Sequence, residues 1–450
     1  MENKLLVGFG AGDITPDWPI GLQGLGTEAT RIHTEVASRI YIYCVAITDA
    51  AGETALIMSI DAGSGGFAED VLPAITEKLG IPRDHMILSA LHQHSTPWGG
   101  EKYDALVIKG GLEAAEQALK DRAPATMQLN RVTTDALSFV RHYIANDPKG
   151  TIVGDNYNDA VGKEYGYKCH ESESDKEMRL VKFVREDKKP IIMVNFQAHP
   201  HMGAFGPNLT KLHADWPGIT RDLVAEALNA HCIYISGAGG NLNSNSRIRT
   251  ENVSCNWKHH GIRAADYVLR AEKTYQDAQA GLLKFKTVTI PYAANHSQDH
   301  LLEQASYIHS LRKTDFDLAK KEVKNYPELH SIYHATSIVN KAARGATREL
   351  TIGAITLGDV AFTAHPYEMF DTNGMELRAG TLGNPNYETQ QSNPYPMTFV
   401  CTLGNGHLGY VPSRMGYTNG GYSTDIAYLA PGSGEQLVND YLTILNELHG

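Results

Sequence analysis

Short blocks of apolar residues recur along the chain, either alternating with polar positions or running together, and they predict β-strands. The blocks are rich in β-branched and aromatic residues, which suit a pleated and half-buried backbone. The predicted strands are residues 4–15 (ending in a glycine turn), 38–50, 54–63, 85–91, 176–187, 189–199, 231–246 (running into a glycine- and asparagine-rich loop), 282–292 and 350–366. Residues 176–199 and 350–366 each read as an antiparallel hairpin, because a tight polar turn divides each of them.

Other segments repeat apolar residues at the spacing of one helix face. The predicted helices are residues 65–80, 103–123, 215–230, 256–281, 367–380 and 434–450, and a polar stretch at 297–345 is predicted to be a helical insertion. Gly80 and Gly380 end two of the helices, and Asp215 and Pro217 stand near the start of another. Strands and helices mix without a strict βαβ period. This favours an α/β fold, a mixed-sheet α/β or α+β sandwich, over a barrel or a doubly wound sheet.

Composition narrows the class of protein. The chain has 450 residues with 42% hydrophobic and 20% charged positions, which is typical of a globular protein with one large domain or two to three smaller ones. A net charge of −11 without a basic cluster argues against a nucleic-acid partner. No run of 18 apolar residues exists, so we expect no stable membrane insertion.

The five cysteines are scattered, and none forms a C-x-x-C pair. The N-terminal segment lacks the apolar core and cleavage site of a secretory signal peptide. We therefore expect unpaired thiols and a cytoplasmic location. Any bound metal would have to use histidine, carboxylate or tyrosine.

Histidines follow several of the predicted strands, and the ends of strands are where sites are usually built. The pairs at these positions are His92 with His94, His199 with His201, His365 with Glu368, and His407 with Tyr410. On an extended backbone, residues two apart point to the same side, so His92 and His94 could converge on one ion. Two His-x-His units and a later carboxylate could complete a His/His/Glu centre with an open position, as in catalytic zinc sites. The alternative is that each histidine only forms hydrogen bonds with the backbone of its loop. Because four clusters share one layout, the metal is favoured.

The same segments resemble the neutral ceramidase family (neutral/alkaline, non-lysosomal), in its N-terminal catalytic domain. The family patterns G-x-x-D-I-T-P, H-T-H-S-G-P-G-G, nf-x-x-H and S-x-D-y-P-G correspond to GAGDITP (10–16), HQHSTPWGG (92–100), NFQAHPHMG (195–203) and LHADWPG (212–218). The patterns G-D-v-s-P-N, P-x-E and gYvtT…Y-E-G correspond to GNLNSN (240–245), HPYE (365–368) and GYVPSRMGYTNGGYS (409–423). The matches keep the order of the family and extend from residue 8 to about 425.

The resemblance implies a set of site residues. The zinc ligands of the family fall on His92, His199, Glu368 and Tyr410. His94 takes the place of a proton relay or of a residue that orients the metal site. Tyr422 takes the place of a tyrosine that faces the substrate carbonyl, with core packing as the alternative. Arg141 matches an arginine that holds the substrate, with a surface salt bridge as the alternative. The expected organisation is one catalytic domain over residues 1–450, with the insertion at 297–345 and without the C-terminal immunoglobulin-like domain of true ceramidases.

The chain departs from the family pattern at three positions. Asn243 stands where the family has a serine proposed at the reaction centre, and Ser244 is adjacent. Asn241 replaces an aspartate, and Trp98 interrupts the P-G-G motif. The two asparagines line the pocket or close a turn. Asp215 caps its helix or orients a ligand histidine, while His201, His365 and His407 are either structural or lie next to the metal site.

The sequence thus predicts a zinc-dependent hydrolase that uses metal-activated water to cleave a small polar N-acyl or acylated-sugar substrate, at an amide or an ester. The family precedent, amide hydrolysis of an N-acylated amino alcohol, favours an amidohydrolase acting on linear amides. One alternative is a metal-dependent lyase or isomerase that uses His94 as a base on a carbohydrate-like substrate. Another is a non-catalytic metal-binding relative, which the intact ligand set argues against. The expected partner is a small-molecule substrate, and the sequence does not decide whether the protein forms a homo-oligomer.

Overall fold

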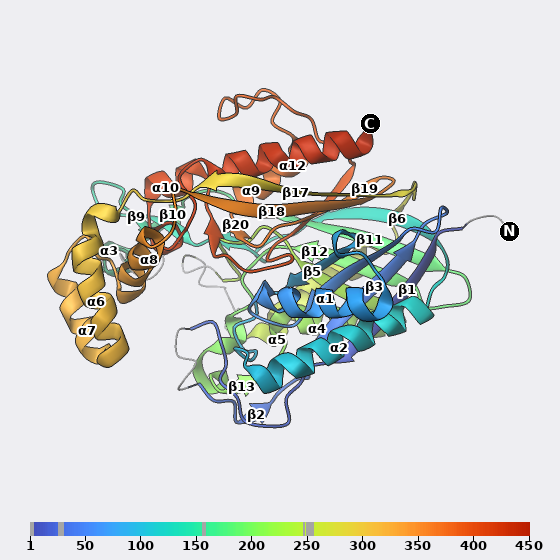
Figure 1. Cartoon of the computed structure of the whole chain (residues 1–450), viewed down its shortest axis with the longest axis horizontal. Helices are drawn as coiled ribbons and strands as arrows, with labels where there is room; N and C mark the ends of the chain where they lie inside the picture. Colours follow the sequence, from blue (N-terminus) through green and yellow to red (C-terminus); the bar gives the residue numbers. More distant parts are fainter. Residues whose placement is uncertain (1–3, 26–30, 155–158, 246–247, 249–255) are drawn as a thin grey trace.

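The computed structural model describes residues 4–25, 31–154, 159–245, 248 and 256–450. Two β-sheets lie face to face, and helices cover the outer face of each sheet, so the chain forms four layers in the order α/β/β/α (Figure 1). The predicted mixed α/β sandwich is thereby confirmed. Two sequence-based expectations, the end of the loop in 231–246 and the state of Cys255, lie outside the described residues.

The larger sheet is mixed. Its strands are, in order, β14 (His231–Ser236), β12 (Ile191–Phe196), β11 (Glu177–Arg185), β6 (Ala123–Thr133), β1 (Leu6–Asp13), β3 (Tyr41–Thr48), β4 (Thr54–Ile60) and β5 (Met86–Ala90), and β16 (Gln276–Ala278) pairs with β6. The pairs β12–β14 and β4–β5 are parallel and the others are antiparallel. Parallel strands therefore occur near each end of the sheet, and the helices that connect them lie on its outer face.

The smaller sheet has the order β17 (Leu283–Ala293), β18 (Thr347–Leu357), β19 (Val360–Ala364) and β21 (Met397–Cys401). The two sheets enclose one apolar core, to which Val7, Ile47, Phe183, Phe362 and Phe399 contribute. The helices that cover the larger sheet are α1 (Ala68–Leu79), α2 (Glu101–Lys120), α4 (Asp215–Ala227) and α5 (Trp257–Ala271). The smaller sheet is covered by α9 (Asp371–Ala379) and α12 (Ser433–His449).

Short elements surround this framework. They are β2 (Glu35–Val36) with β13 (Lys211–Leu212), β7 (Phe139–Val140) with β15 (Leu242–Asn243), β20 (Glu368–Met369) with β22 (Tyr410–Val411), the sheet of β8 (His142–Ala145), β9 (Ile152–Gly154) and β10 (Tyr167–His170), and the helices α3 (Asp159–Tyr165), α10 (Arg414–Asn419) and α11 (Tyr422–Asp425). The segment 297–345 forms α6 (Leu302–Thr314), α7 (Phe316–Glu322) and α8 (Ile332–Ala342), which pack around a small core of their own. No helix among the described residues combines the length and the apolar character needed to cross a lipid bilayer.

The glycine turn expected at the end of segment 4–15 is wrong, because β1 continues through its glycines. Gly8, Gly10 and Gly12 alternate along β1 on the face that meets α2, and a Cβ atom at any of them would overlap a backbone carbonyl oxygen of that helix. The glycines therefore permit the close approach of helix and strand rather than a change of direction.

Two further boundaries differ from expectation. The helix predicted at 256–281 ends at Ala271, and residues 276–278 form the edge strand β16 instead. Strand β6 was not predicted: Ala125, Met127 and Leu129 alternate with polar residues, but the segment contains Pro124, and only Ala123 and Met127 are buried. Its pairing with both β1 and β11 fixes it as a strand.

Candidate metal centre

Short strand pairs bring distant segments of the chain together at the site. In the parallel pair β20–β22, Glu368 and Tyr410 are direct partners, so their side chains start from neighbouring backbone positions. An isolated parallel bridge joins His199 to Asn243. The backbone N–H of Arg141 donates to the carbonyl of Asn241 at 2.9 Å. These backbone contacts place residues from five separate segments around one point.

His92 and His94 do converge, but not through an extended strand as expected. His92 has a left-handed backbone with φ of 62°, which is uncommon for a residue other than glycine and is concentrated at functional sites. The two Nε2 atoms are 3.3 Å apart, and the rings meet edge to face. A tight turn, rather than strand alternation, therefore brings the two imidazoles together.

The ring nitrogens of His92 and His199 are oriented by backbone carbonyls. Nδ1 of His92 donates to the carbonyl of Gly63 at 2.8 Å, and Nδ1 of His199 donates to that of Leu242 at 2.9 Å and to that of Gly239 at 3.1 Å. A neutral imidazole that donates through Nδ1 carries a lone pair on Nε2. Backbone partners of this kind are typical of histidines that bind metals.

Both Nε2 atoms face the same carboxylate oxygen. Oε2 of Glu368 lies 3.1 Å from Nε2 of His92 and 3.2 Å from Nε2 of His199. Neither Nε2 of His199 nor Oε2 of Glu368 makes a hydrogen bond of normal geometry with the described residues, although both atoms are buried. Lone pairs that face each other at this distance require a proton or a cation between them. Tetrahedral zinc bound at 2.0–2.1 Å separates its ligand atoms by about 3.3 Å, so these residues fit that ion.

The charges of the site suit a cation. Burial opposes ionisation of Glu368, but the adjacent imidazoles of His92, His199 and His407 hold the pKa of this carboxyl well below its usual range. Burial and the neighbouring His92 hold the pKa of His94 well below its usual value, and burial lowers the pKa of His199 as well. Burial alone would lower the pKa of His92, but Glu368 more than offsets this and raises it. The carboxylate is thus an anion beside two imidazoles, those of His94 and His199, whose lowered pKa values favour the neutral form.

The predicted tyrosines and arginine form a group next to Glu368, through Tyr410 as its strand partner. The rings of Tyr410 and Tyr422 are 6.1 Å apart between centroids and nearly perpendicular. Arg141 is buried, its guanidinium carbon lies 5.4 Å from the centre of the Tyr410 ring, and it donates to the hydroxyl of Ser423. The alternative of a surface salt bridge for Arg141 is therefore wrong. Burial, followed by the nearby Glu368, raises the pKa of Tyr410 well above its usual value.

One cavity of about 690 Å³ is lined by all seven residues predicted from the sequence, together with the side chains that surround them. The seven are His92, His94, Arg141, His199, Glu368, Tyr410 and Tyr422. The nitrogens of His92, His94 and His199 lie within 4.8 Å of one another, so His94 is also close enough to be a ligand.

The cavity also receives His201, His407 and Asn243, which the sequence left undecided, and its remaining wall includes Trp98, Phe205 and Tyr333. Trp98 and Phe205 are 61% and 51% exposed, so they form the rim rather than the floor.

Several candidates lie outside the cavity lining. His365 is fully buried, and neither of its ring nitrogens has a hydrogen-bond partner among the described residues. Ser244 donates its hydroxyl to the backbone carbonyl of His199 at 2.5 Å, so it supports the loop. Asp215 accepts the backbone N–H groups of Gly203 at 2.8 Å and Trp216 at 2.7 Å, and burial raises its pKa to about 7. Asp215 thus holds the segment after His201 and, among the described residues, forms no hydrogen bond with His92 or His199.

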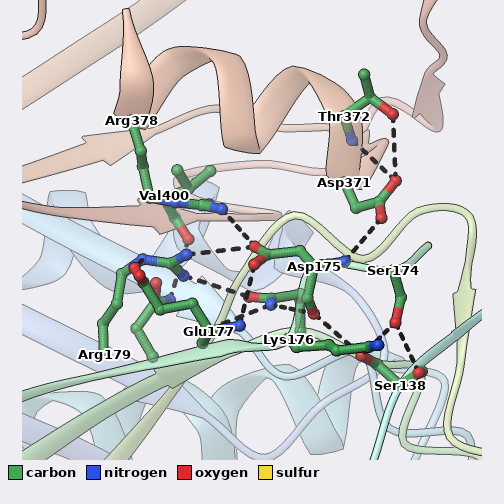
Figure 2. A network of polar contacts seen from close by, with 12 residues as sticks. Ser138, Ser174, Asp175, Lys176, Glu177, Arg179, Asp371, Thr372, Arg378 and Val400 are labelled. Carbon is green, nitrogen blue, oxygen red and sulfur yellow. Dashed lines mark hydrogen bonds and ion pairs between the residues drawn. The ribbon is translucent and has the colours of Figure 1, made fainter. Parts of the chain in front are cut away.

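A buried polar network behind the centre was not foreseen from the sequence. Asn241 and Asp371 form a reciprocal pair: Nδ2 of Asn241 donates to Oδ1 of Asp371 at 2.7 Å, and the backbone N–H of Asp371 donates to Oδ1 of Asn241 at 2.9 Å. Figure 2 shows how Asp371 continues to Asp175, whose carboxylate meets Arg179 and Arg378. Asn241 therefore closes this contact rather than lining the cavity. The only hint in the sequence is that Asp371 closely follows Glu368.

Comparisons with known proteins support the fold. Neither the search of protein-family models nor the search of curated proteins found a match. Among solved structures, the neutral ceramidase from Pseudomonas aeruginosa matches 100% of this chain and 75% of its own, with a TM-score of 0.72 and 15% sequence identity. A ceramidase complexed with C2 matches 99% of this chain and 75% of its own, with a TM-score of 0.70 and 15% identity. The chain therefore has the fold of the neutral ceramidase structures, as its sequence motifs indicated.

Proposed function

We propose that this protein is a zinc-dependent hydrolase that cleaves an amide or an ester bond in a small, polar N-acyl or acylated-sugar substrate. The observation that carries the proposal is the convergence of His92, His199 and Glu368, with two oriented Nε2 lone pairs facing one buried carboxylate oxygen. Tyr410, the strand partner of Glu368, is the proposed fourth ligand. Zinc held by these residues supplies a water of near-neutral pKa and polarises a carbonyl group.

The remaining residues of the cavity have roles that follow from their positions. His94 lies next to His92, where an imidazole can take a proton from the attacking water and deliver it to the leaving group. Tyr422 lines the same cavity and is the proposed donor to the negative charge that develops on the carbonyl oxygen. Arg141 holds the segment around both tyrosines through its contacts with Tyr410 and Ser423.

The nucleophile in this proposal is water. Asn243 occupies the position of the family's serine and has no nucleophilic oxygen, and the hydroxyl of Ser244 is directed to the backbone of His199. A cavity of about 690 Å³ is within the usual range for small-molecule sites. We favour an amide bond because two solved structures with this fold are ceramidases.

The test is a screen of acylated amines, esters and acylated sugars, with metal-stripped protein as the control. The proposal expects hydrolysis that is lost on stripping and restored by zinc, with one oxygen from ¹⁸O-labelled water in the acid product. An unsaturated product without label would indicate a lyase instead. Turnover that survives complete removal of metal would contradict the proposal, and zinc binding without turnover of any substrate would indicate a non-catalytic relative.

A further inference from the structure

A second polar cluster connects the helical insertion to the short helix that carries Tyr422. Nδ1 of His330, just before α8, donates to Oδ2 of Asp425 at 2.6 Å. Nζ of Lys341, at the end of α8, donates to the backbone carbonyl of Asp425 at 2.9 Å. Asp425 is the last residue of α11, the helix that begins with Tyr422, and it is 5% exposed. These residues, together with His334, are called the Asp425 cluster below.

The insertion also forms part of the cavity wall. Tyr333, on the first turn of α8, lines the cavity together with Tyr422 and Ile426. Figure 1 shows α6, α7 and α8 grouped at one end of the molecule, away from the two large sheets. Lys341 is 2% exposed, also donates to the side chain of Gln298 at 3.0 Å, and has its pKa lowered to about 8 by burial. The cluster is thus a buried joint between the insertion and the cavity.

A metal does not account for the Asp425 cluster, although its two histidines and one carboxylate lie within 4.8 Å of one another. Nδ1 of His334 accepts the backbone N–H of His330 at 3.2 Å, so the neutral ring carries its proton on Nε2. Nε2 lies 3.9 Å from Oδ1 of Asp425 and therefore presents a proton instead of a lone pair. The 2.6 Å between His330 and Asp425 is a hydrogen-bond distance and is shorter than the roughly 3.3 Å between zinc ligands. Hydrogen bonds therefore hold the Asp425 cluster together. At Glu368, by contrast, lone pairs of the ring nitrogens face the carboxylate oxygen.

Helix α11 depends on such outside contacts. It has four residues, and it follows Gly420 and Gly421, whose φ angles of 73° and 103° suit glycine. An isolated helix of this length is unstable in water, because its nucleation is not repaid by further turns. The direction of Tyr422 therefore depends on the contacts that hold the rest of α11, in addition to its own ring contact with Tyr410.

We propose that Asp425 is a positioning residue, which ties α11 to the insertion through His330 and Lys341 and thereby fixes Tyr422 at the cavity. The part of this inference that concerns catalysis rests on the proposed function, in which Tyr422 donates to the carbonyl oxygen. A displacement of about 1 Å can cost a reaction up to 100-fold in rate. The insertion thus supports the site in addition to enclosing it.

The first test measures hydrolysis of 4-nitrophenyl acetate by the zinc-loaded protein. Tyr422→Phe is expected to lower kcat about 100-fold. Asp425→Asn is expected to lower kcat about tenfold or more, with KM and zinc content unchanged. In the double variant, the loss should equal that of Tyr422→Phe alone, because Asp425 acts only through Tyr422. Losses that multiply in the double variant would overturn the proposal. Asp317→Asn, which changes an exposed aspartate on α7 in the same insertion, is the matched control and should leave kcat unchanged.

The second test does not depend on turnover. Hydrogen–deuterium exchange should become faster at residues 422–429 and 332–342 in Asp425→Asn, and to a smaller extent in the milder His330→Gln, while residues 86–94 stay unchanged. Unchanged exchange at 422–429 in both variants would overturn the proposal, even if the protein hydrolyses nothing. Lack of turnover combined with faster exchange would instead refute the proposed function and leave the positioning role of Asp425 intact. A second zinc per chain that Asp425→Asn removes would also overturn the hydrogen-bonded Asp425 cluster.

Discussion

The pair formed by Asn241 and Asp371 connects the two halves of the candidate metal centre, and its loss should have a measurable, pH-dependent cost. The loop of Asn241 supplies the carbonyl of Leu242 that orients His199, and Asp371 follows the strand of Glu368. Two hydrogen bonds of 2.7 and 2.9 Å join the pair, and both residues are buried. We therefore expect substitutions at Asn241 to change the free energy of unfolding more directly than the catalytic activity.

Asn241→Ala removes both hydrogen bonds of the pair. A buried bond to a charged group contributes about 1.5–3 kcal/mol, and a buried backbone N–H left without an acceptor costs about 1–3 kcal/mol. The free energy of unfolding should therefore fall by about 3–5 kcal/mol. The loss should be largest above about pH 6, where Asp371 is ionised, because its buried carboxylate then no longer accepts the hydrogen bond from the Asn241 amide.

Asn241→Asp places two carboxyl groups face to face, and only a shared proton can replace the lost amide hydrogen bond. The folded protein would hold this proton to a higher pH than the unfolded chain does. The folded state then binds more protons than the unfolded state, so stability falls as pH rises, by about 1.4 kcal/mol for each pH unit. The stability of the wild type also depends on pH, because burial raises the pKa of Asp371 to about 6. The quantity to compare is therefore the difference in the free energy of unfolding between the variant and the wild type at each pH.

Urea unfolding followed by tryptophan fluorescence at pH 5, 6.5 and 8 would measure this difference. Asn241→Asp should be close to wild type at pH 5 and clearly less stable at pH 8. Asn393→Asp, a half-buried asparagine whose amide donates to a backbone carbonyl and a threonine hydroxyl, controls for the added carboxyl group. Parallel pH profiles for Asn241→Asp and wild type would refute the reciprocal pair.

Two further predictions concern the framework. In Gly10→Ala, the new methyl group would overlap the carbonyl oxygen of Ala114 and lie 2.6 Å from the amide nitrogen of Ala118, so α2 must move away from β1. The free energy of unfolding should fall by about 1–3 kcal/mol. An unchanged midpoint of urea unfolding would contradict the close packing. Burial lowers the pKa of His365 to about 3, so the unfolded chain takes up a proton below about pH 6.5 that the folded protein does not, and stability is lost as pH falls. His365→Phe should reduce this acid loss by about 1.4 kcal/mol for each pH unit, and an unchanged slope of unfolding free energy between pH 6.5 and 4.5 would argue against a neutral buried imidazole.

The sequence predicted those parts of the fold that carry a local pattern. Apolar runs such as 54–63 identified strands of the core, and the spacing of 103–123 identified α2. Strand β6 lacks such a run. It is a strand because it pairs with neighbouring strands, and its own side chains indicate this only weakly. The glycines of β1 indicate a turn when only the sequence is considered, because the reason for them is the close packing of α2 against the strand.

For the site, the order of the motifs singled out the seven cavity residues, but it did not indicate how they meet. The side-by-side placement of Glu368 and Tyr410 depends on the pairing of two short strands, which no local pattern reveals. The pair of Asn241 and Asp371 is equally non-local. The left-handed turn at His92 lies within a single segment, but its residue type does not predict the positive φ.

The zinc content of the purified protein tests the central claim most directly. The account predicts about one zinc per chain in the wild type, and loss of that zinc in His92→Ala and in Glu368→Ala, since each removes one of the donors that converge at 3.1–3.2 Å. His365→Phe, which changes a buried histidine outside the cavity, should retain the metal. Metal content that neither His92→Ala nor Glu368→Ala affects would contradict the account.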